Sequence, residues 1–109
     1  YELASASGLS ASVETTSVPL LPSINDLVEG GFVAGGTERN LDFLEPFLSG
    51  GSFTERLILC DAQTSGGLLF SCDASAAVDA VAELTEAGHF AAVVGELEPG
   101  DPGHIALRS

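Results

Sequence analysis

The feature that most constrains the fold of this chain is a strand–helix–strand pattern between residues 68 and 97. The run Leu68–Cys72 is almost continuously apolar, as in strands that are buried on both faces. An alanine-rich helix is predicted over Asp73–Ala87, where Gly88 ends it, and a second strand is predicted over Phe90–Leu97. The apolar residues on the inner face of this helix are expected to be Val78, Val81, Ala82 and Leu84.

Further helices and strands are predicted around this unit. The expected helices are a helix end over residues 1–8, a short helix over Ile24–Glu29 with Ser23 as its N-cap, and a helix that Thr37 caps and Pro46 limits. The expected strands cover Leu9–Val18 and Ile105–Arg108. Residues 54–60 fit either a helix or a strand, and residues 50–52 are expected to be a flexible break. These elements predict an α+β fold, in which helices pack on a mixed β-sheet.

The charge of the chain is strongly one-sided. It has 16 acidic residues, three arginines and no lysine, which gives a net charge of -13. Such a surface repels polyanions, so we expect neither nucleic-acid binding nor binding to an anionic membrane. A nucleotide kinase needs cations near its phosphates. If this chain takes part in phosphate chemistry, most of the positive charge must come from outside it.

Length and hydropathy predict one globular domain. The 109 residues are 45% hydrophobic, which is enough for a hydrophobic core. No apolar run approaches the roughly 18 residues that span a bilayer, and no signal-peptide pattern is visible, so a cytoplasmic location is expected. The chain begins at Tyr1 within what is predicted to be a helix end. We therefore expect residues 1–109 to be a single domain excised from a longer protein.

The cysteines and histidines predict no catalytic or metal site. Cys60 and Cys72 form no C-x-x-C pair, and His89 and His104 lack metal-ligand spacing. Both cysteines are expected to be reduced residues in or near the core.

Two glycine-containing motifs are the candidates for function. In the first motif, Gly35–Asn40, two glycines precede a helix, so backbone N–H groups and the helix dipole are available to an anion. Arg39 adds a cation, whereas Glu38 would repel a phosphate. A capped helix after a tight turn explains the same residues. The candidate phosphate-binding or ATP-cleft residues are Gly35, Gly36, Thr37, Arg39 and Asn40.

The second motif, Asp61–Gly67, is a polar turn that ends in two glycines before the predicted buried strand. Its side chains are suited to a dense set of hydrogen bonds, and its glycines to close backbone packing. A purely structural turn explains these residues as well. The residues concerned are Asp61, Gln63, Thr64, Ser65, Gly66 and Gly67.

Together the two motifs resemble those of selenophosphate synthetases (selenide, water dikinases). Cys60–Leu69 is similar to the D-[PA]-Q-T-S-G-G-L-L signature near the C-terminus of that family, and Gly35–Leu41 is similar to its G-G-T-x-R-N element. Related enzymes of the aminoimidazole-ribonucleotide-synthetase superfamily share looser forms of the glycine turn. The resemblance covers nearly the whole chain and implies an N-terminally truncated C-terminal domain of a two-domain enzyme.

The resemblance implies a parent enzyme that makes selenophosphate from selenide, ATP and water, with release of AMP and phosphate. It also implies ATP and Mg²⁺ in a homodimeric parent, whose nucleophile and most of whose Mg²⁺-binding aspartates lie in the N-terminal part. No catalytic residue is therefore assigned to this chain, and Asp61 is expected to fix its turn by accepting backbone N–H bonds. The chain alone is expected to be inactive, to bind no cofactor, and to self-associate through uncovered apolar surface.

Two alternatives stay open at this point. The chain fits another ATP-dependent phosphotransferase of the same superfamily, and it fits a non-catalytic dimerisation or interaction module. The sequence that precedes Tyr1 separates the first of these from a selenium-specific enzyme, which requires a Cys or selenocysteine nucleophile.

Overall fold

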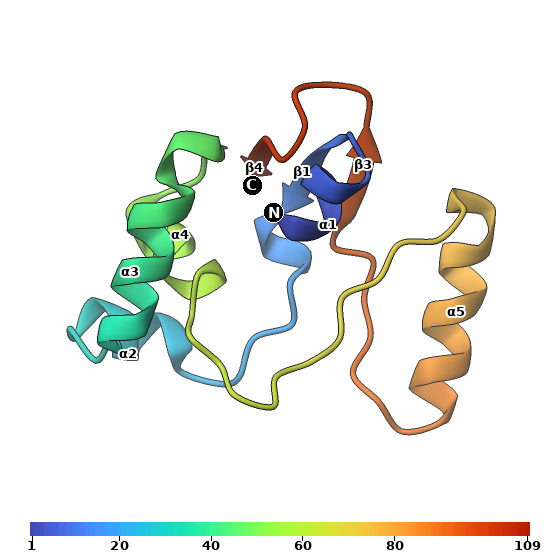
Figure 1. The fold of residues 1–109 in the computed structure, drawn as a ribbon. Coiled ribbons are helices and arrows are strands. Elements are labelled where there is room, and N and C mark those ends of the chain that lie inside the picture. The colour runs from blue at the N-terminus through green and yellow to red at the C-terminus, as the bar shows by residue number, and fades with distance from the viewer.

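The structure, a computed structural model, describes residues 1–109 as a small β-sheet with helices on both sides of it (Figure 1). The helices are α1 (Glu2–Ala6), α2 (Ile24–Glu29), α3 (Gly35–Leu44), α4 (Phe53–Leu59) and α5 (Ala74–Glu86). The strands are β1 (Ser10–Glu14), β2 (Leu48–Gly50), β3 (Gly95–Glu98) and β4 (Ile105–Arg108). Short 3-10 turns cover Thr15–Ser17 and Glu45–Phe47. None of the helices has both the length and the apolar character needed to cross a membrane.

The four strands form one mixed sheet in the order β2-β4-β1-β3. β1 pairs antiparallel with β3, placing Val13 opposite Gly95, and parallel with β4, placing Val13 opposite Leu107. β2 extends the sheet by pairing parallel with β4. This arrangement confirms the predicted α+β fold with a mixed sheet.

The hydrophobic core lies between α3, α4 and the β2 end of the sheet. Its buried members are Leu41 of α3, Leu57 of α4 and Cys60, which follows α4. Half-buried apolar side chains surround them: Val28, Val33, Leu44 and Leu48. Figure 1 shows α2, α3 and α4 together on one side of the sheet, and α5 apart from them on the other side.

The predicted strand at Leu68–Cys72 is wrong. These residues form no regular element and are exposed, with Leu68 at 97% exposure. None of their backbone groups takes part in a backbone–backbone hydrogen bond, because the segment lies along neither edge of the sheet. The strand predicted over Phe90–Leu97 is realised only at its end, as β3.

Helix α5 confirms the alanine-rich prediction, but it buries no residue. Val81 and Leu84 are half-buried, whereas Val78 and Ala82 of the predicted inner face are exposed. The apolar face of α5 is therefore present as predicted, but only Val81 and Leu84 of it are partly covered by other residues.

Other predicted boundaries changed for local reasons. Ser23 adopts a φ of 65° and makes no capping bond. α3 begins at Gly35 with Ala34 as its N-cap, and the Thr37 hydroxyl bonds Asp61 instead of capping the helix. The ambiguous segment 54–60 is helical, and Ser52 caps it. The predicted flexible break at residues 50–52 instead begins within β2.

Glu55 joins the start of α4 to distant parts of the chain. Its carboxylate accepts the Ser52 backbone N–H in a capping box, and it also accepts hydroxyl bonds from Thr15 and Ser109. The Thr15 hydroxyl, followed by the Ser52 and Ser109 donors, lowers the pKa of Glu55 to about 2. Hydrogen bonds to the charged form explain this direction.

The low pKa of Glu55 predicts a pH-dependent contribution to stability. A carboxylate with a depressed folded-state pKa stabilises the fold above its unfolded value of 4.5, and this contribution is lost as pH falls toward about 2. We expect Glu55→Gln to lower the urea midpoint at about pH 6, with a difference from wild type that shrinks between about pH 4.5 and pH 2. A difference that stays constant over this range would contradict the assignment.

Candidate functional site

The structure brings the two motifs into direct contact, although 24 residues separate the two side chains that join them. Thr37, in the first turn of α3, is only 2% exposed. Its hydroxyl donates to Asp61 Oδ1 at 2.9 Å and accepts the Ala62 backbone N–H at 3.1 Å. The hydroxyl of Thr37 therefore does not cap its own helix but holds the second motif against the first.

Asn40 makes a second connection between the motifs. Residues three apart on a helix lie on the same face, so Asn40 projects from α3 beside Thr37. Its side-chain amide donates to the Cys60 carbonyl at 3.0 Å. Cys60 is the C-cap of α4, where carbonyl groups lack a partner within the helix, so Asn40 satisfies one of them.

Gly36 allows the two motifs to approach closely. A Cβ at this position would lie 2.8 Å from the Ala62 Cβ, closer than two carbon atoms can pack. At Gly35 a Cβ would find ordinary contact, 3.7 Å from the Arg39 guanidinium. The second glycine of the pair is thus required by packing between the motifs.

The second motif is also braced from within. Gln63 donates to Asp61 Oδ2 at 3.3 Å, so both oxygens of Asp61 have side-chain donors. The expectation that Asp61 accepts backbone N–H bonds is wrong, since its donors are Thr37 and Gln63. Ser65 has a φ of 58°, and at Gly66 a Cβ would lie 2.6 Å from the Gln63 side-chain oxygen.

Some predicted site residues make no contact between the motifs. The side chains of Thr64, Ser65 and Arg39 form no hydrogen bond or ion pair in the chain. Of the other two arginines, Arg56 bonds the Gly50 carbonyl and pairs with Glu45, and Arg108 pairs with Glu98. Arg39 is therefore the one arginine free to meet an anion.

The site shows neither a metal cluster nor an activated nucleophile. No group of three or more His, Cys, Asp or Glu side chains is arranged to hold a metal ion. Burial raises the pKa of the Cys60 thiol, which keeps it protonated and unreactive. Cys72 is exposed rather than near the core, and His104 shares a 3.0 Å hydrogen bond with Ser49.

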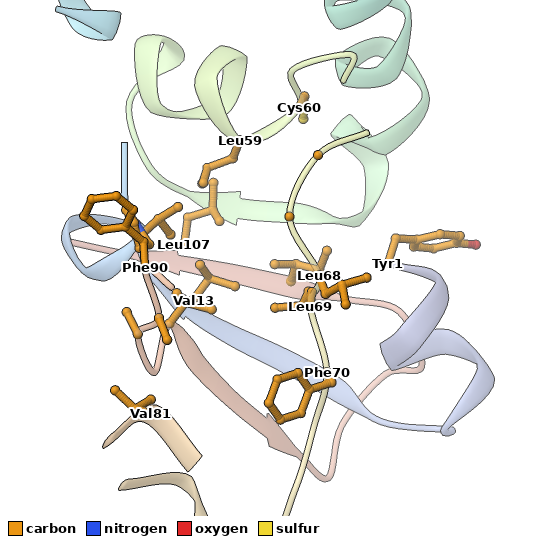
Figure 2. A pocket seen from close by; sticks show the side chains of 18 of the residues that line it. Tyr1, Val13, Leu59, Cys60, Leu68, Leu69, Phe70, Val81, Phe90 and Leu107 are labelled. Carbon is orange, nitrogen blue, oxygen red and sulfur yellow. The ribbon is translucent and has the colours of Figure 1, made fainter. Parts of the chain in front are cut away.

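An apolar cavity of about 870 Å³ begins at the glycines of the second motif. Figure 2 shows Leu68, Leu69 and Phe70 on one side of it and Val13 and Leu107 of the sheet on another. The sequence did not indicate this cavity, because its wall residues Leu68, Leu69 and Phe70 were assigned to a buried strand. The strongly apolar character of these residues was the one feature of the sequence that could have indicated an apolar cavity.

The chain is similar to known proteins over nearly its whole length. The family described as "AIR synthase related protein, C-terminal domain" matches residues 1–107. A "Selenide, water dikinase" of Porphyromonas gingivalis is 44% identical over 86% of this chain, and that of Yersinia pseudotuberculosis is 36% identical over 92%. A "Selenide, water dikinase" of a Shewanella species is 40% identical over 97% of the chain. The chain spans only 28%, 29% and 30% of the lengths of these three relatives.

Proposed function

This chain belongs to the family of AIR synthase related protein C-terminal domains, and from that premise we propose that it is the C-terminal domain of a selenide, water dikinase. The parent enzyme then makes selenophosphate from selenide, ATP and water and releases AMP and phosphate. The observation that carries this proposal is the contact of the two family-like motifs through Thr37 and Asp61. Either motif alone would be weaker support for this family than the pair of motifs.

We assign the two joined motifs to the wall of the ATP cleft. The start of α3 presents backbone N–H groups, which suit an anion, and Arg39 is the arginine with no internal acidic partner. The negative charge of Glu38 in the same turn limits how many phosphate groups this wall holds. Most of the phosphate-binding cations therefore belong to the rest of the parent enzyme, which packs against this domain and forms a cytoplasmic homodimer.

The residues present do not fit a magnesium site of their own. Both oxygens of Asp61 are engaged by side chains of this chain, and no cluster of candidate ligands is present. Magnesium binding, the nucleophile and the chemical steps are therefore assigned to the rest of the parent. The 109-residue chain alone is expected to be inactive.

The test uses a longer natural protein that contains this chain. We expect selenide-dependent formation of AMP, phosphate and selenophosphate, followed by ³¹P NMR. Consumption of ATP with another small acceptor, but not with selenide, would indicate a different phosphotransferase. If no ATP is consumed with any acceptor, the chain is a non-catalytic module, and the proposal fails.

The role of Arg39 is tested in the same protein. We expect Arg39→Gln to raise the KM for ATP roughly tenfold, the effect of losing about 1.4 kcal/mol of binding. Arg108→Gln is the matched control, because Arg108 is an exposed arginine that pairs with Glu98 at the far edge of the sheet. Equal KM values for ATP in both variants would show that Arg39 does not contact ATP, and would contradict its assignment to the ATP cleft.

A further inference from the structure

The turn that follows Ala62 in the second motif is held by one hydrogen bond. The backbone groups of residues 63–67 take part in no backbone–backbone hydrogen bond, and the side chains of Thr64 and Ser65 have no partner in the chain. The bond that remains is that from the Gln63 amide to Asp61 Oδ2. Asp61 is itself joined to α3 through the Thr37 hydroxyl. The Gln63 side chain therefore connects this turn to α3.

The Gln63 side chain also reaches the far end of the turn. While its amide nitrogen bonds Asp61, its oxygen lies against Gly66. A Cβ on Gly66 would lie 2.6 Å from this oxygen and 3.3 Å from the Gln63 Cβ. Gly66 does not have a positive φ, so this contact, and not the backbone conformation, requires a glycine. Gln63 thus forms a bridge from Asp61 to Gly66.

The residues spanned by this bridge include one in an unfavourable conformation. Ser65 has a φ of 58°, in the left-handed region that residues with a Cβ rarely adopt. Such a conformation persists only where the surrounding structure imposes it. Because no backbone pairing does so here, the Gln63 bridge is the contact that keeps Ser65 in this conformation.

The second motif begins beside the arginine that has no acidic partner. A Cβ on Gly36 would lie 2.8 Å from the Ala62 Cβ and 3.8 Å from the Arg39 guanidinium, so both groups lie around the same point of α3. Thr64 and Ser65 follow shortly after Ala62 and are exposed. Hydroxyl and guanidinium groups are both donors, and phosphate oxygens accept hydrogen bonds from each.

From these observations we propose that Gln63 is a positioning residue for the wall of the ATP cleft, an inference that rests on the proposed function. Its bridge fixes the turn so that the Thr64 and Ser65 hydroxyls donate to phosphate oxygens of ATP alongside Arg39. Gln63 acts through these groups and does not itself contact the nucleotide. Asp61 and Gln63 are both exposed, so loss of their bond affects ATP binding more than stability.

An exchange of the two polar groups tests the bridge in the longer natural protein that contains this chain. Gln63→Glu keeps the shape of the side chain, removes its N–H donor and opposes two carboxylates. We expect the KM for ATP to rise roughly fivefold. Changes of less than about twofold are expected in kcat and in the KM for selenide, and of less than about 2 °C in Tm.

The double variant Asp61→Asn/Gln63→Glu restores a donor and an acceptor. The introduced amide donates to the introduced carboxylate, and its oxygen still accepts the Thr37 hydroxyl bond. We expect the KM for ATP to return to within about twofold of wild type. A double variant no better than Gln63→Glu alone would overturn the inference.

Gly66→Ala disrupts the same bridge from its other end. The added methyl group would meet the Gln63 side-chain oxygen, so the Gln63 amide has to turn away from Gly66 and from Asp61. We expect the KM for ATP to rise roughly fivefold, with no further rise when Gly66→Ala is combined with Gln63→Glu. Multiplied effects would show that the two residues act independently and would contradict the bridge.

Asn25→Asp is the matched control, because it makes the same amide-to-carboxylate change at an exposed residue of α2, outside both motifs. Its KM for ATP is expected to stay within about twofold of wild type. An equal rise in Asn25→Asp and Gln63→Glu would reduce the effect to net charge, and a large fall in Tm in Gln63→Glu would make Gln63 a structural residue. Either result overturns the inference. An unchanged KM for ATP in an active Gln63→Glu protein defeats this inference alone, whereas a wild-type protein that consumes no ATP defeats the proposed function as well.

Discussion

Replacing Gly95 with alanine is expected to lower the free energy of unfolding by roughly 3 kcal/mol or more. Gly95 lies opposite Val13 in the β1–β3 pairing. A Cβ at this position would lie 2.0 Å from the Ser12 carbonyl oxygen and 3.0 Å from the Val13 Cα. These are backbone atoms of the neighbouring strand, so no side-chain rotation relieves the clash. Urea unfolding followed by circular dichroism measures the loss.

Gly35→Ala is the matched control for this substitution. A Cβ at Gly35 makes only ordinary contact with Arg39, and alanine is favoured over glycine within a helix by up to about 1 kcal/mol. We expect this variant to be as stable as wild type or slightly more stable. If Gly95→Ala unfolds at the same urea concentration as Gly35→Ala, the described β1–β3 approach is incorrect.

Replacing Thr37 with valine is expected to cost about 1–3 kcal/mol, although the two side chains have nearly the same shape. The variant keeps the packing of the buried residue but removes the bonds to Asp61 and to the Ala62 N–H. The cost arises because the Asp61 carboxylate and the Ala62 N–H each lose a hydrogen-bond partner. Equilibrium unfolding of the variant measures it.

Thr37→Ser separates the hydroxyl from the methyl group. Serine keeps both hydrogen bonds and loses one buried methyl, so a cost of about 0.8 kcal/mol is expected. Combining Thr37→Val with Asp61→Ala should then give less than the sum of the single effects, because both remove the same bond. Additive effects, or a valine variant as stable as wild type, would show that this bond does not join the motifs.

The helices were largely predictable because local interactions determine them. Glycine stops and apolar spacing indicated α2 and α5 close to their observed bounds, although neither Ser23 nor Asp73 makes a capping bond. At α4, Ser52 and Glu55 form a capping box, a pattern that is recognisable in sequence. The segment 54–60 stayed ambiguous because seven residues are too few to distinguish a helical from a strand periodicity. The N-cap prediction for Thr37 failed because a distant carboxylate, that of Asp61, competes for the same hydroxyl.

The strands were less predictable because pairing partners lie far apart in the chain. β2 has only three residues, two of them polar or glycine, and it forms a strand because β4 offers a free edge. Leu68–Cys72 has a strong strand pattern but no edge beside it in this arrangement. A sequence pattern indicates which secondary structure a segment favours, but a strand forms only where another strand edge lies beside it.

The two motifs show what each level of structure decided. The sequence by itself determined their residues, the resemblance that they carry and the absence of lysine, since these depend on identity and spacing alone. Only the tertiary structure decided that Thr37 and Asp61 meet, that Gly36 must be small because Ala62 lies against it, and that Arg39 has no internal partner. Such facts depend on which surfaces come together when α3 and α4 pack, and contacts between residues distant in the chain have no local signature.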